Sequence, residues 1–415
     1  MNTKIIISII MALLCLQCSK ESIPVESENK NILELNDTEK LVVQSSNAFG
    51  LKLFNEIVDA EGDTNIFISP LSVSMALGMT LNGAAGNTYE AMQTVLSWQD
   101  LSEDEINTSY SHIIKLLVGL DPMVIFEIAN SIWYREGFQV EPDFIAVNKT
   151  YFNAEVSSLN FSNPSAIDII NKWVSDKTHG KIEEIIDEID ALVVMFLINA
   201  LYFKGTWSYE FDEQLTYDDY FNLPDGSLKP CKMMKQKWEH AYFENEYFQA
   251  IDLPYGDGNF RMTIFLPKHG KSTNSLTADF TPDNWILWMK SFDKDSVSIF
   301  LPKFKVEYKI KLNDVLSEMG MGIAFVPGLA DFSRIRKSGE LWIDKVLHKT
   351  FVDVNEEGTE AAAVTVVEMR ELSTGGEEEI IMRVDRPFIF TIREASSNTI
   401  LFMGKIVDPV YTITN

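Results

Sequence analysis

The side chains that most often act as nucleophiles, general bases or metal ligands are scarce in this chain of 415 residues. It has five histidines and three cysteines, and beyond Cys15 and Cys18 none of them form a pair at a spacing typical of metal ligands. Cys15 and Cys18 both lie at the N-terminus. Cys231 lies in a polar, lysine-flanked stretch, where a structural thiol is a better interpretation than a catalytic one. We therefore expect no metal and no cofactor.

Motifs of the common catalytic sites do not occur in the sequence either. It contains no G-x-S-x-G nucleophile turn and no H-E-x-x-H zinc helix. Gly270, Lys271 and Ser272 look like the end of a phosphate-binding loop, but Phe265 stands where the first glycine of that loop belongs. We interpret this stretch as a surface turn. The sequence thus predicts a protein that is not an enzyme.

Composition and charge exclude further classes. Hydrophobic residues make up 46% of the chain and charged residues 23%, which is typical of a globular protein and not of a disordered or collagen-like one. There are 35 basic and 61 acidic residues, so the formal net charge is −26. Because such a chain repels the phosphate backbone, we expect no binding to nucleic acid.

The N-terminus reads as a targeting segment. Residues 1–17 combine one lysine with a short apolar run, which predicts a secretory signal and not a membrane-spanning helix. Cys18 follows that run, as the lipidated cysteine does in a bacterial lipoprotein signal. Cys15 is a weaker candidate, and a plain secretory signal is the alternative. We expect the chain to cross the inner membrane and to be lipid-anchored to the outer membrane or the cell surface. Residues 18–38, polar and charge-rich, predict a flexible tether.

The order of the expected elements indicates the fold class. Apolar spacing predicts helices over 40–57, 71–81 and 167–178, and a buried strand over 124–134. Helices that come first and strands that come later, without βαβ alternation, favour an α+β fold with antiparallel or mixed sheets. Because no second linker is visible, residues 39–415 are expected to form one domain. The later strands are expected at 193–203, 260–266, 297–301, 352–354, 380–384, 388–392 and 400–406.

One segment near the C-terminus combines a strand pattern with an exposed position. In residues 356–368, EEGTEAAAVTVVE, uncharged residues recur at every second position from Thr359 to Val367. The pattern predicts a strand with one face that can be buried. Residues 373–379 follow at once and read as an exposed loop. The segment is either a strand held out of its sheet or a hairpin with an acidic tip, and the pattern alone does not decide between them.

The same segment and seven others resemble the serpin family, in family order over residues 40–410. That likeness implies one domain with three β-sheets, eight to nine helices and an exposed reactive-centre loop at about 356–381. The matching stretches are NIFISPLSVSMALGMTLNGAAGNT at 65–88, INKWVSDKTHGKI at 170–182, NALYFKGTW at 199–207, LPKFKVE at 301–307, ADFS at 330–333, EEGTEAAA at 356–363, DRPFIFTI at 385–392 and LFMGKIVDP at 401–409.

The resemblance also implies a mechanism. A serpin offers its loop as a substrate, the nucleophile of the protease attacks the scissile bond, and the cut loop inserts into the central sheet before the acyl-enzyme hydrolyses. The protease is then trapped irreversibly. This implies a serine endopeptidase as the partner of a monomer, with cysteine proteases as a further class, and it explains why the chain needs no nucleophile of its own.

The composition of the hinge favours an inhibitor. Thr359, Ala361 and Ala363 would point into the sheet, and a charge there would carry a burial penalty that stalls insertion. The alternatives are a non-inhibitory binding module with a serpin fold that is cleaved without trapping, and an unrelated surface enzyme, for which the sequence offers no support. The hinge that the resemblance implies consists of Glu356, Gly358, Thr359, Glu360, Ala361, Ala362 and Ala363.

Two further groups of residues match functional positions of the serpin family, each residue by its own position. Trp207 matches the aromatic residue at the top of the central sheet, and Lys303 with Glu356 matches an ion pair that anchors the hinge. The second group matches a polar cluster beneath the place where the strands part, and it consists of Ser69, Ser72, Asn199 and His348.

The position of the scissile bond follows from the hinge length usual in the family, which places it at Leu372-Ser373. Leu372 would suit proteases with an apolar specificity pocket, such as chymotrypsin-, elastase- or subtilisin-like enzymes. Arg370-Glu371 is an alternative bait for trypsin-like proteases, although the acidic neighbour disfavours it. The loop before Pro387 is about four residues longer than is common in the family. The position assigned to the scissile bond depends on where in the loop these extra residues lie.

Overall fold

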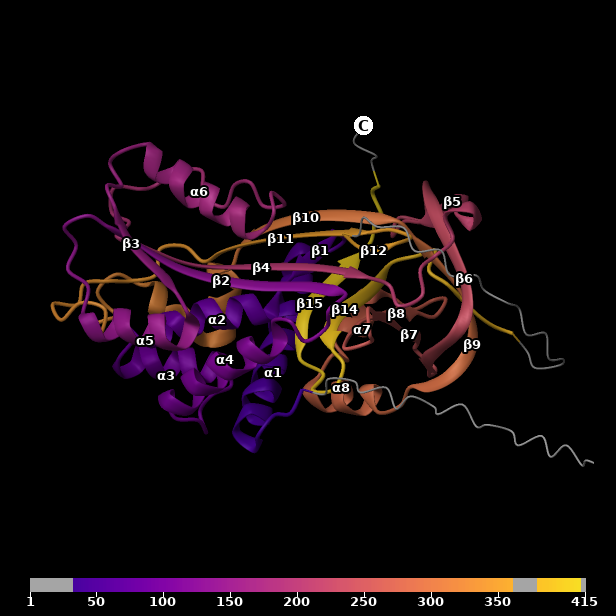
Figure 1. Ribbon diagram of the computed structural model, residues 1–415, viewed down its shortest axis with the longest axis horizontal. Helices are drawn as coiled ribbons and strands as arrows, with labels where there is room; N and C mark the ends of the chain where they lie inside the picture. Colours follow the sequence, from indigo (N-terminus) through magenta and orange to yellow (C-terminus); the bar gives the residue numbers. More distant parts are fainter. Residues whose placement is uncertain (1–32, 361–378, 412–415) are drawn as a thin grey trace, which may run out of the picture. The chain divides into compact units, whose positions relative to one another are not determined.

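The computed structural model describes residues 33–360 and 379–411, in which helices come first and strands predominate later (Figure 1). Their order agrees with the expected α+β class. In these ranges there are nine α-helices: α1 (Asp37–Glu61), α2 (Pro70–Leu81), α3 (Gly86–Val95), α4 (Glu103–Leu117), α5 (Pro142–Phe152), α6 (Ser165–Lys177), α7 (Thr273–Thr277), α8 (Pro282–Met289) and α9 (Asn313–Leu316).

Local capping explains where the first two helices begin. Asn36 and Glu39 form a reciprocal capping box, so α1 begins at Asp37, three residues before the predicted start. The side chain of Ser69 caps α2 by accepting a hydrogen bond from the backbone N–H of Ser72, and Pro70 occupies the first helical position. The end of α2 at Leu81 agrees with the predicted stop.

A six-stranded sheet forms the centre of the fold. Its strands run side by side as a layer in Figure 1, and β12 is a two-residue strand between two longer ones. All neighbours in it are antiparallel except β2 and β3. The order across the sheet is β10 (Phe304–Lys311), β11 (Leu347–Val354), β12 (Gly358–Thr359), β4 (Met195–Thr206), β2 (Val124–Arg135) and β3 (Glu155–Leu159).

A nine-stranded sheet packs beside it and consists of two parts. The parts are joined where Ala241–Glu244 of β6 pair with β7. Counted by hydrogen bonding, the described residues thus contain two sheets, and the larger one divides into the two further sheets that the resemblance implied. One part is β1 (Ile66–Ile68), β15 (Ile400–Ile406), β14 (Phe388–Glu394), β8 (Phe260–Pro267) and β7 (Phe248–Tyr255); the other is β5 (Tyr217–Asn222), β6 (Leu228–Glu244), β9 (Asp293–Pro302) and β13 (Ile380–Arg383).

The six-stranded sheet has two different faces (Figure 1). We call the face covered by α6 the outer face, and the face toward α1–α5 and the nine-stranded sheet the inner face. A large hydrophobic core lies on the inner side, and a separate cluster that includes Ile170, Trp173 and Ile198 lies between α6 and the outer face. The described residues form one unit by their contacts. The central sheet is therefore a buried layer.

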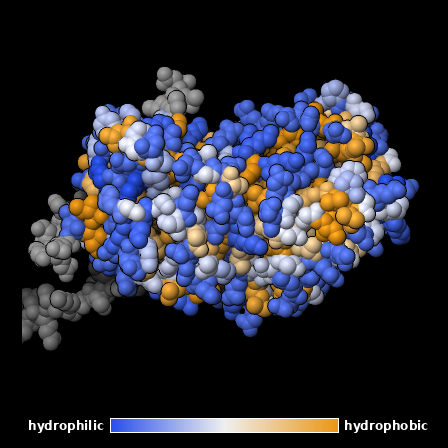
Figure 2. Space-filling view, turned by 180° about the vertical axis from the view of Figure 1, so that it is seen from behind, coloured by the Kyte–Doolittle hydropathy of each residue, from blue (hydrophilic) through white to orange (hydrophobic). Residues whose placement is uncertain are grey.

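The surface is largely hydrophilic, as the composition predicts. Figure 2 shows a face on which hydrophilic side chains predominate and hydrophobic ones form separate patches. The most exposed apolar side chains, Leu192, Leu329 and Leu287, come from separate parts of the chain. Among the described residues, none of the helices combines the length and the apolar character that crossing a membrane requires.

Candidate functional site

The centre of the six-stranded sheet is open, and the hinge occupies one end of the opening. Gly358 and Thr359 of β12 pair with Thr206 and Gly205 of β4, and Thr359 also pairs with Val354 of β11. Within the described residues, β4 and β11 form no ladder with each other. The two strands are thus separated by the width of one strand, and the first two hinge residues already fill that width.

Gly358 is required by the close approach of β4. Its φ of 156° lies in a region that L-residues rarely adopt, and a Cβ atom at this position would lie 2.0 Å from the carbonyl oxygen of Gly205. A side chain here would push β12 away from β4. The glycine of the predicted hinge therefore lets the hinge sit within the sheet.

Thr359 faces inward and is almost fully buried, with 2% of its surface exposed. Its hydroxyl lies 2.5 Å from the hydroxyl of Tyr255 in β7. Because the position is buried, a polar side chain here needs a hydrogen-bonding partner, and the Tyr255 hydroxyl supplies one. The inward orientation agrees with the period-two pattern of the sequence.

Glu360 faces outward and marks the point where the described chain leaves the sheet. Its backbone N–H still donates to Asp353, but its φ is 58°, outside the extended region. Its carboxylate accepts a hydrogen bond from the Tyr202 hydroxyl at 3.1 Å and lies 3.0 Å from Lys181 Nζ, just after α6. The hinge is thus held from both faces of the sheet.

The other residues predicted around the hinge also gather here. Lys303 Nζ lies 2.6 Å from Glu356 Oε2, and both side chains are largely buried. The Trp207 indole N–H donates to the carbonyl of Asn355 at 3.0 Å, and its ring stacks on Tyr255 with centroids 4.4 Å apart. The segment before β12 is therefore anchored by an ion pair and by an aromatic stack.

The predicted polar cluster lies farther along the same opening, on the inner face. The backbone N–H of Ser69 donates to His348 Nε2 at 3.0 Å, and the Ser69 hydroxyl donates to the carbonyl of Leu401 at 2.7 Å. The hydroxyl of Ser69 also accepts from the Ser72 N–H. These contacts connect α2 to β11 and β15, so the cluster joins the helical layer to one edge of the opening.

Asn199 lies on the other edge and does not contact His348. Its amide donates to Asn130 Oδ1 at 2.8 Å, and Asn130 in turn donates to the carbonyl of Phe152. The Oδ1 atom of Asn199 is buried and has no hydrogen-bonding partner among the described residues. The two halves of the predicted cluster are thus separated by the opening, and one of them keeps an unused acceptor.

His348 is neutral in this environment. Complete burial disfavours the imidazolium ion and lowers the pKa of His348 from 6.5 to about 4. Because Nε2 accepts the Ser69 N–H, the ring proton lies on Nδ1. Protonation would place a second N–H against the backbone donor of Ser69 and weaken the contact between α2 and β11.

This pKa predicts an acid-dependent loss of stability. Between pH 6.5 and 4 the unfolded state binds a proton at His348 and the native state does not, so the free energy of unfolding falls as the pH falls, by up to about 3 kcal/mol at pH 4. Denaturant unfolding across this range should show a smaller slope for His348→Gln than for the wild type. His269→Asn, which alters an exposed histidine, should leave the slope unchanged; equal slopes for the wild type and His348→Gln would contradict the assignment.

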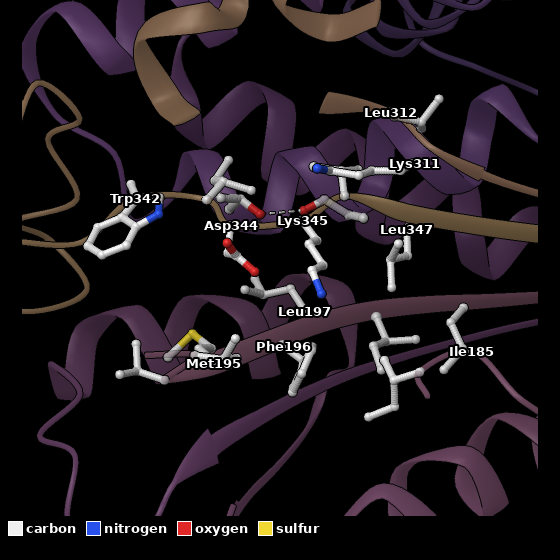
Figure 3. Close-up of a pocket in the computed structure, with 18 of the residues that line it drawn as sticks. Ile185, Met195, Phe196, Leu197, Lys311, Leu312, Trp342, Asp344, Lys345 and Leu347 are labelled. Carbon is white, nitrogen blue, oxygen red and sulfur yellow. Dashed lines mark hydrogen bonds between the residues drawn. The ribbon is translucent and has the colours of Figure 1, made fainter. Parts of the chain in front are cut away.

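A cavity of about 590 Å³ continues the opening beyond the polar cluster. Figure 3 shows Met195, Phe196 and Leu197 of β4 on one side of it, and Trp342, Asp344, Lys345 and Leu347, from the start of β11 and the segment before it, on the other. Asn199 and His348 also line it. The cavity therefore lies between the ends of β4 and β11 that are remote from the hinge.

Several predicted residues lie outside the described residues. They are the remaining hinge alanines, both candidate scissile bonds and the lipidation site: Ala361, Ala362, Ala363, Arg370, Glu371, Leu372, Ser373 and Cys18. In the described ranges, no group of three or more His, Cys, Asp or Glu side chains is arranged to hold a metal ion.

The structure also adds residues that the sequence reasoning did not select. Asn130 interrupts an apolar strand, and that interruption was a usable signal for its role beside Asn199. Tyr255, Tyr202 and Lys181 contact the hinge, but nothing in their local sequence distinguishes them from ordinary strand and loop residues. Their role follows only from the packing of β4, β7 and α6 around β12.

Comparison with known proteins agrees with this geometry. A family profile described as "Serpin (serine protease inhibitor)" matches residues 44–409. An uncharacterised serpin-like protein of Thermococcus kodakarensis is 35% identical over 376 residues, covering 89% of this chain and 86% of that protein. Human neuroserpin is 32% identical, covering 86% of this chain and 90% of its own. The chain belongs to the serpin family, whose members are in general protease inhibitors and not enzymes.

Two solved structures resemble the fold closely. The native state of tengpin, a thermophilic serpin, gives a TM-score of 0.83 at 32% identity and covers 91% of this chain and 96% of its own. Human thyroxine-binding globulin in complex with thyroxine gives a TM-score of 0.82 at 29% identity and covers 90% of this chain and 100% of its own. The serpin fold predicted from the motifs is thus confirmed.

Proposed function

We propose that this chain is an irreversible suicide-substrate inhibitor of serine endopeptidases. The observation that carries the proposal is the position of β12, which lies between β4 and β11 at one end of an opening of the width of one strand. A loop cut on its C-terminal side would be free to continue from Thr359 into that opening. The nucleophile would come from the protease, which suits a chain without catalytic motifs.

The register of β12 supports this reaction. If the cut loop continued in the same register, Thr365 would come to lie opposite Asn199 of β4 and opposite His348 of β11. Both neighbours belong to the inward-facing polar cluster, and in such a strand Thr365 would have the inward parity of Thr359. The hydroxyl of Thr365 would thus reach the unused Oδ1 of Asn199 and close the gap in the cluster.

The bait proposed for the protease is Leu372-Ser373. Attack on the carbonyl carbon of Leu372 would form the acyl-enzyme and release the amine of Ser373, and the partner would have an apolar specificity pocket, as chymotrypsin-, elastase- and subtilisin-like enzymes do. Arg370-Glu371 would instead suit trypsin-like enzymes. Cysteine proteases are a further class of partner. The alternative function is a non-inhibitory binding module that proteases cleave without being trapped, and the structural similarity to thyroxine-binding globulin favours keeping it.

A panel of purified serine proteases tests the proposal. The full mature chain should form one-to-one complexes that survive SDS, and mass spectrometry should show that the released C-terminal peptide begins at Ser373. If the chain is cleaved but forms a covalent complex with none of the proteases, the binding module would be supported instead. A peptide that begins at Glu371 would move the bait to Arg370.

The cellular setting is a separate proposal that rests on the N-terminal sequence. Lipidation of Cys18 after removal of residues 1–17 would anchor a monomeric inhibitor to a bacterial membrane. The tether expected over residues 18–38 would have to end before Leu33, because Leu33 is buried in the core and α1 begins at Asp37. Metabolic labelling with a fatty-acid analogue should then mark the chain and fail to mark Cys18→Ser. Labelling that instead disappears in Cys15→Ser would assign the anchor to Cys15.

A further inference from the structure

The far end of the cavity carries charges that strand insertion alone does not require. Lys345 lines it, with Nζ 3.0 Å from Glu188 Oε1, and the two side chains are 34% and 72% exposed. Asp187 and Asp190, in the segment between α6 and β4, line the same end. An ion pair this exposed contributes little to stability. Lys345 can therefore exchange Glu188 for another carboxylate at small cost.

The register of β12 indicates where such a carboxylate would come from. Continued along β4 it would bring Glu368 opposite Phe196, and extended two residues before the start of β11 it would bring Glu368 opposite Lys345. Both registers agree on the face as well. In an inserted strand Glu368 would have the parity of Glu360, which faces outward, and Phe196 contacts Phe161 in the outer cluster.

The next outward position of the loop carries the opposite charge. Arg370 follows Glu368 by two residues, so in an inserted strand it would lie on the same face and one step further toward the start of β4. Asp187, Glu188 and Asp190, from the segment that leads into β4, line the cavity. The wall thus offers a basic side chain, Lys345, to Glu368, and carboxylates to Arg370.

We propose that the charged end of this cavity is a docking site for residues 368–370 of the chain's own cleaved loop. Lys345 leaves Glu188 and pairs with Glu368, and the carboxylate of Glu188 then faces Arg370. The exchange fixes the register at the end of insertion, where the apolar walls by themselves would tolerate a slip of the strand. This inference rests on the proposed function, because it concerns the last step of the insertion.

Charge exchange in the full mature chain tests the site. Glu368→Lys and Lys345→Glu should each lower the guanidinium midpoint of the loop-cleaved protein and raise the stoichiometry of inhibition several-fold, and the double variant should restore most of both losses. The uncleaved proteins should show no such coupling between the two positions. Additive losses in the cleaved double variant would overturn the pairing of Glu368 with Lys345.

Two matched controls separate charge from position. Glu377→Lys makes the same change in the loop but C-terminal to both candidate scissile bonds, so it should leave the midpoint of the cleaved form unchanged. Lys172→Glu breaks an exposed ion pair with Asp176 in α6, away from the cavity, and should not couple to Glu368→Lys. A loss as large as that of Glu368→Lys from either control would overturn the docking site.

The outcome for the wild type distinguishes this inference from the proposed function. A wild type that traps protease and gains stability on cleavage, without coupling between the two positions, would refute the docking site alone. A wild type that does neither would refute the proposed function. Coupling found only in oligomers, after size-exclusion chromatography, would assign the cavity to the loop of a second copy and overturn docking of the chain's own loop.

Discussion

Thr359→Arg is expected to convert the chain from a trap into a substrate that the protease cleaves and releases. Thr359 is 2% exposed and faces inward beside Tyr255, between Gly205 and Val354. A guanidinium group in that position would lose its hydration without gaining a carboxylate, a penalty of several kcal/mol. The hinge would leave the sheet, and deacylation would finish before insertion. Gel analysis should show cleaved chain and no SDS-resistant complex.

Thr359→Ser is the matched control for this experiment, because it keeps the hydroxyl that contacts Tyr255 and adds no charge. It should trap protease with nearly the stoichiometry of the wild type. Both variants should be cleaved at the same bond, since the substitution lies far from the bait in the sequence. A covalent complex formed by Thr359→Arg in wild-type yield would contradict the insertion mechanism.

Cleavage of the loop is expected to raise the stability of the protein by a large amount. Within the described residues, β4 and β11 face an opening and not each other, so backbone groups on both edges lack partners in the sheet. A strand of residues 361–370 would pair on both sides. At about 1 kcal/mol for each net hydrogen bond, the gain is on the order of 10 kcal/mol. Limited proteolysis followed by guanidinium unfolding measures it.

The cleaved form of Thr359→Arg provides the control, because its loop is cut but is not expected to insert. Its unfolding midpoint should stay close to that of the uncleaved protein. If the wild type also keeps its midpoint after cleavage, the chain is cut without insertion. The binding-module alternative would then be the better description.

Both predictions describe a native state that is not the most stable arrangement of the chain. At one end of the opening the hinge is held by Tyr255, Tyr202 and Lys181, and farther along it the polar cluster holds α2 against β11. If the cut loop inserts as proposed, the free energy that insertion releases would be stored in the uncleaved protein as unpaired sheet edges.

Much of the fold could be predicted because its signals are local. The apolar period of α2 and its stop at Leu81 lie within the helix, and β8, β14 and β15 are predominantly apolar runs. By contrast, β6 is the longest strand of the fold and was not predicted. Its sequence, LKPCKMMKQKWEHAYFE, is rich in lysine, and its burial follows from pairing with β9, which is distant in the sequence.

The candidate site likewise contains some residues that could be predicted from the sequence and others that could not. The small residues of the hinge, the motifs around Ser69 and His348, and the Glu356–Lys303 pair could be named from the resemblance alone. Asn130, Tyr255 and Lys181 could not, because each reaches the hinge or the cluster from a different element. A residue whose role consists of one contact across the fold leaves no periodic signal in its own segment.

Residue types and local periods indicate that the chain carries none of the common catalytic motifs, that it has an α+β fold, and that a strand-like segment with one small-residue face follows Glu356. Neighbouring residues carry all of these signals. The position of Gly358 and Thr359 within the sheet, and the cavity that lies past Asn199 and His348 toward Lys345, become visible only once the chain is folded. An opening between β4 and β11 is a relation between strands far apart in the chain, set by the layers packed on both faces of the sheet, so no single segment encodes it.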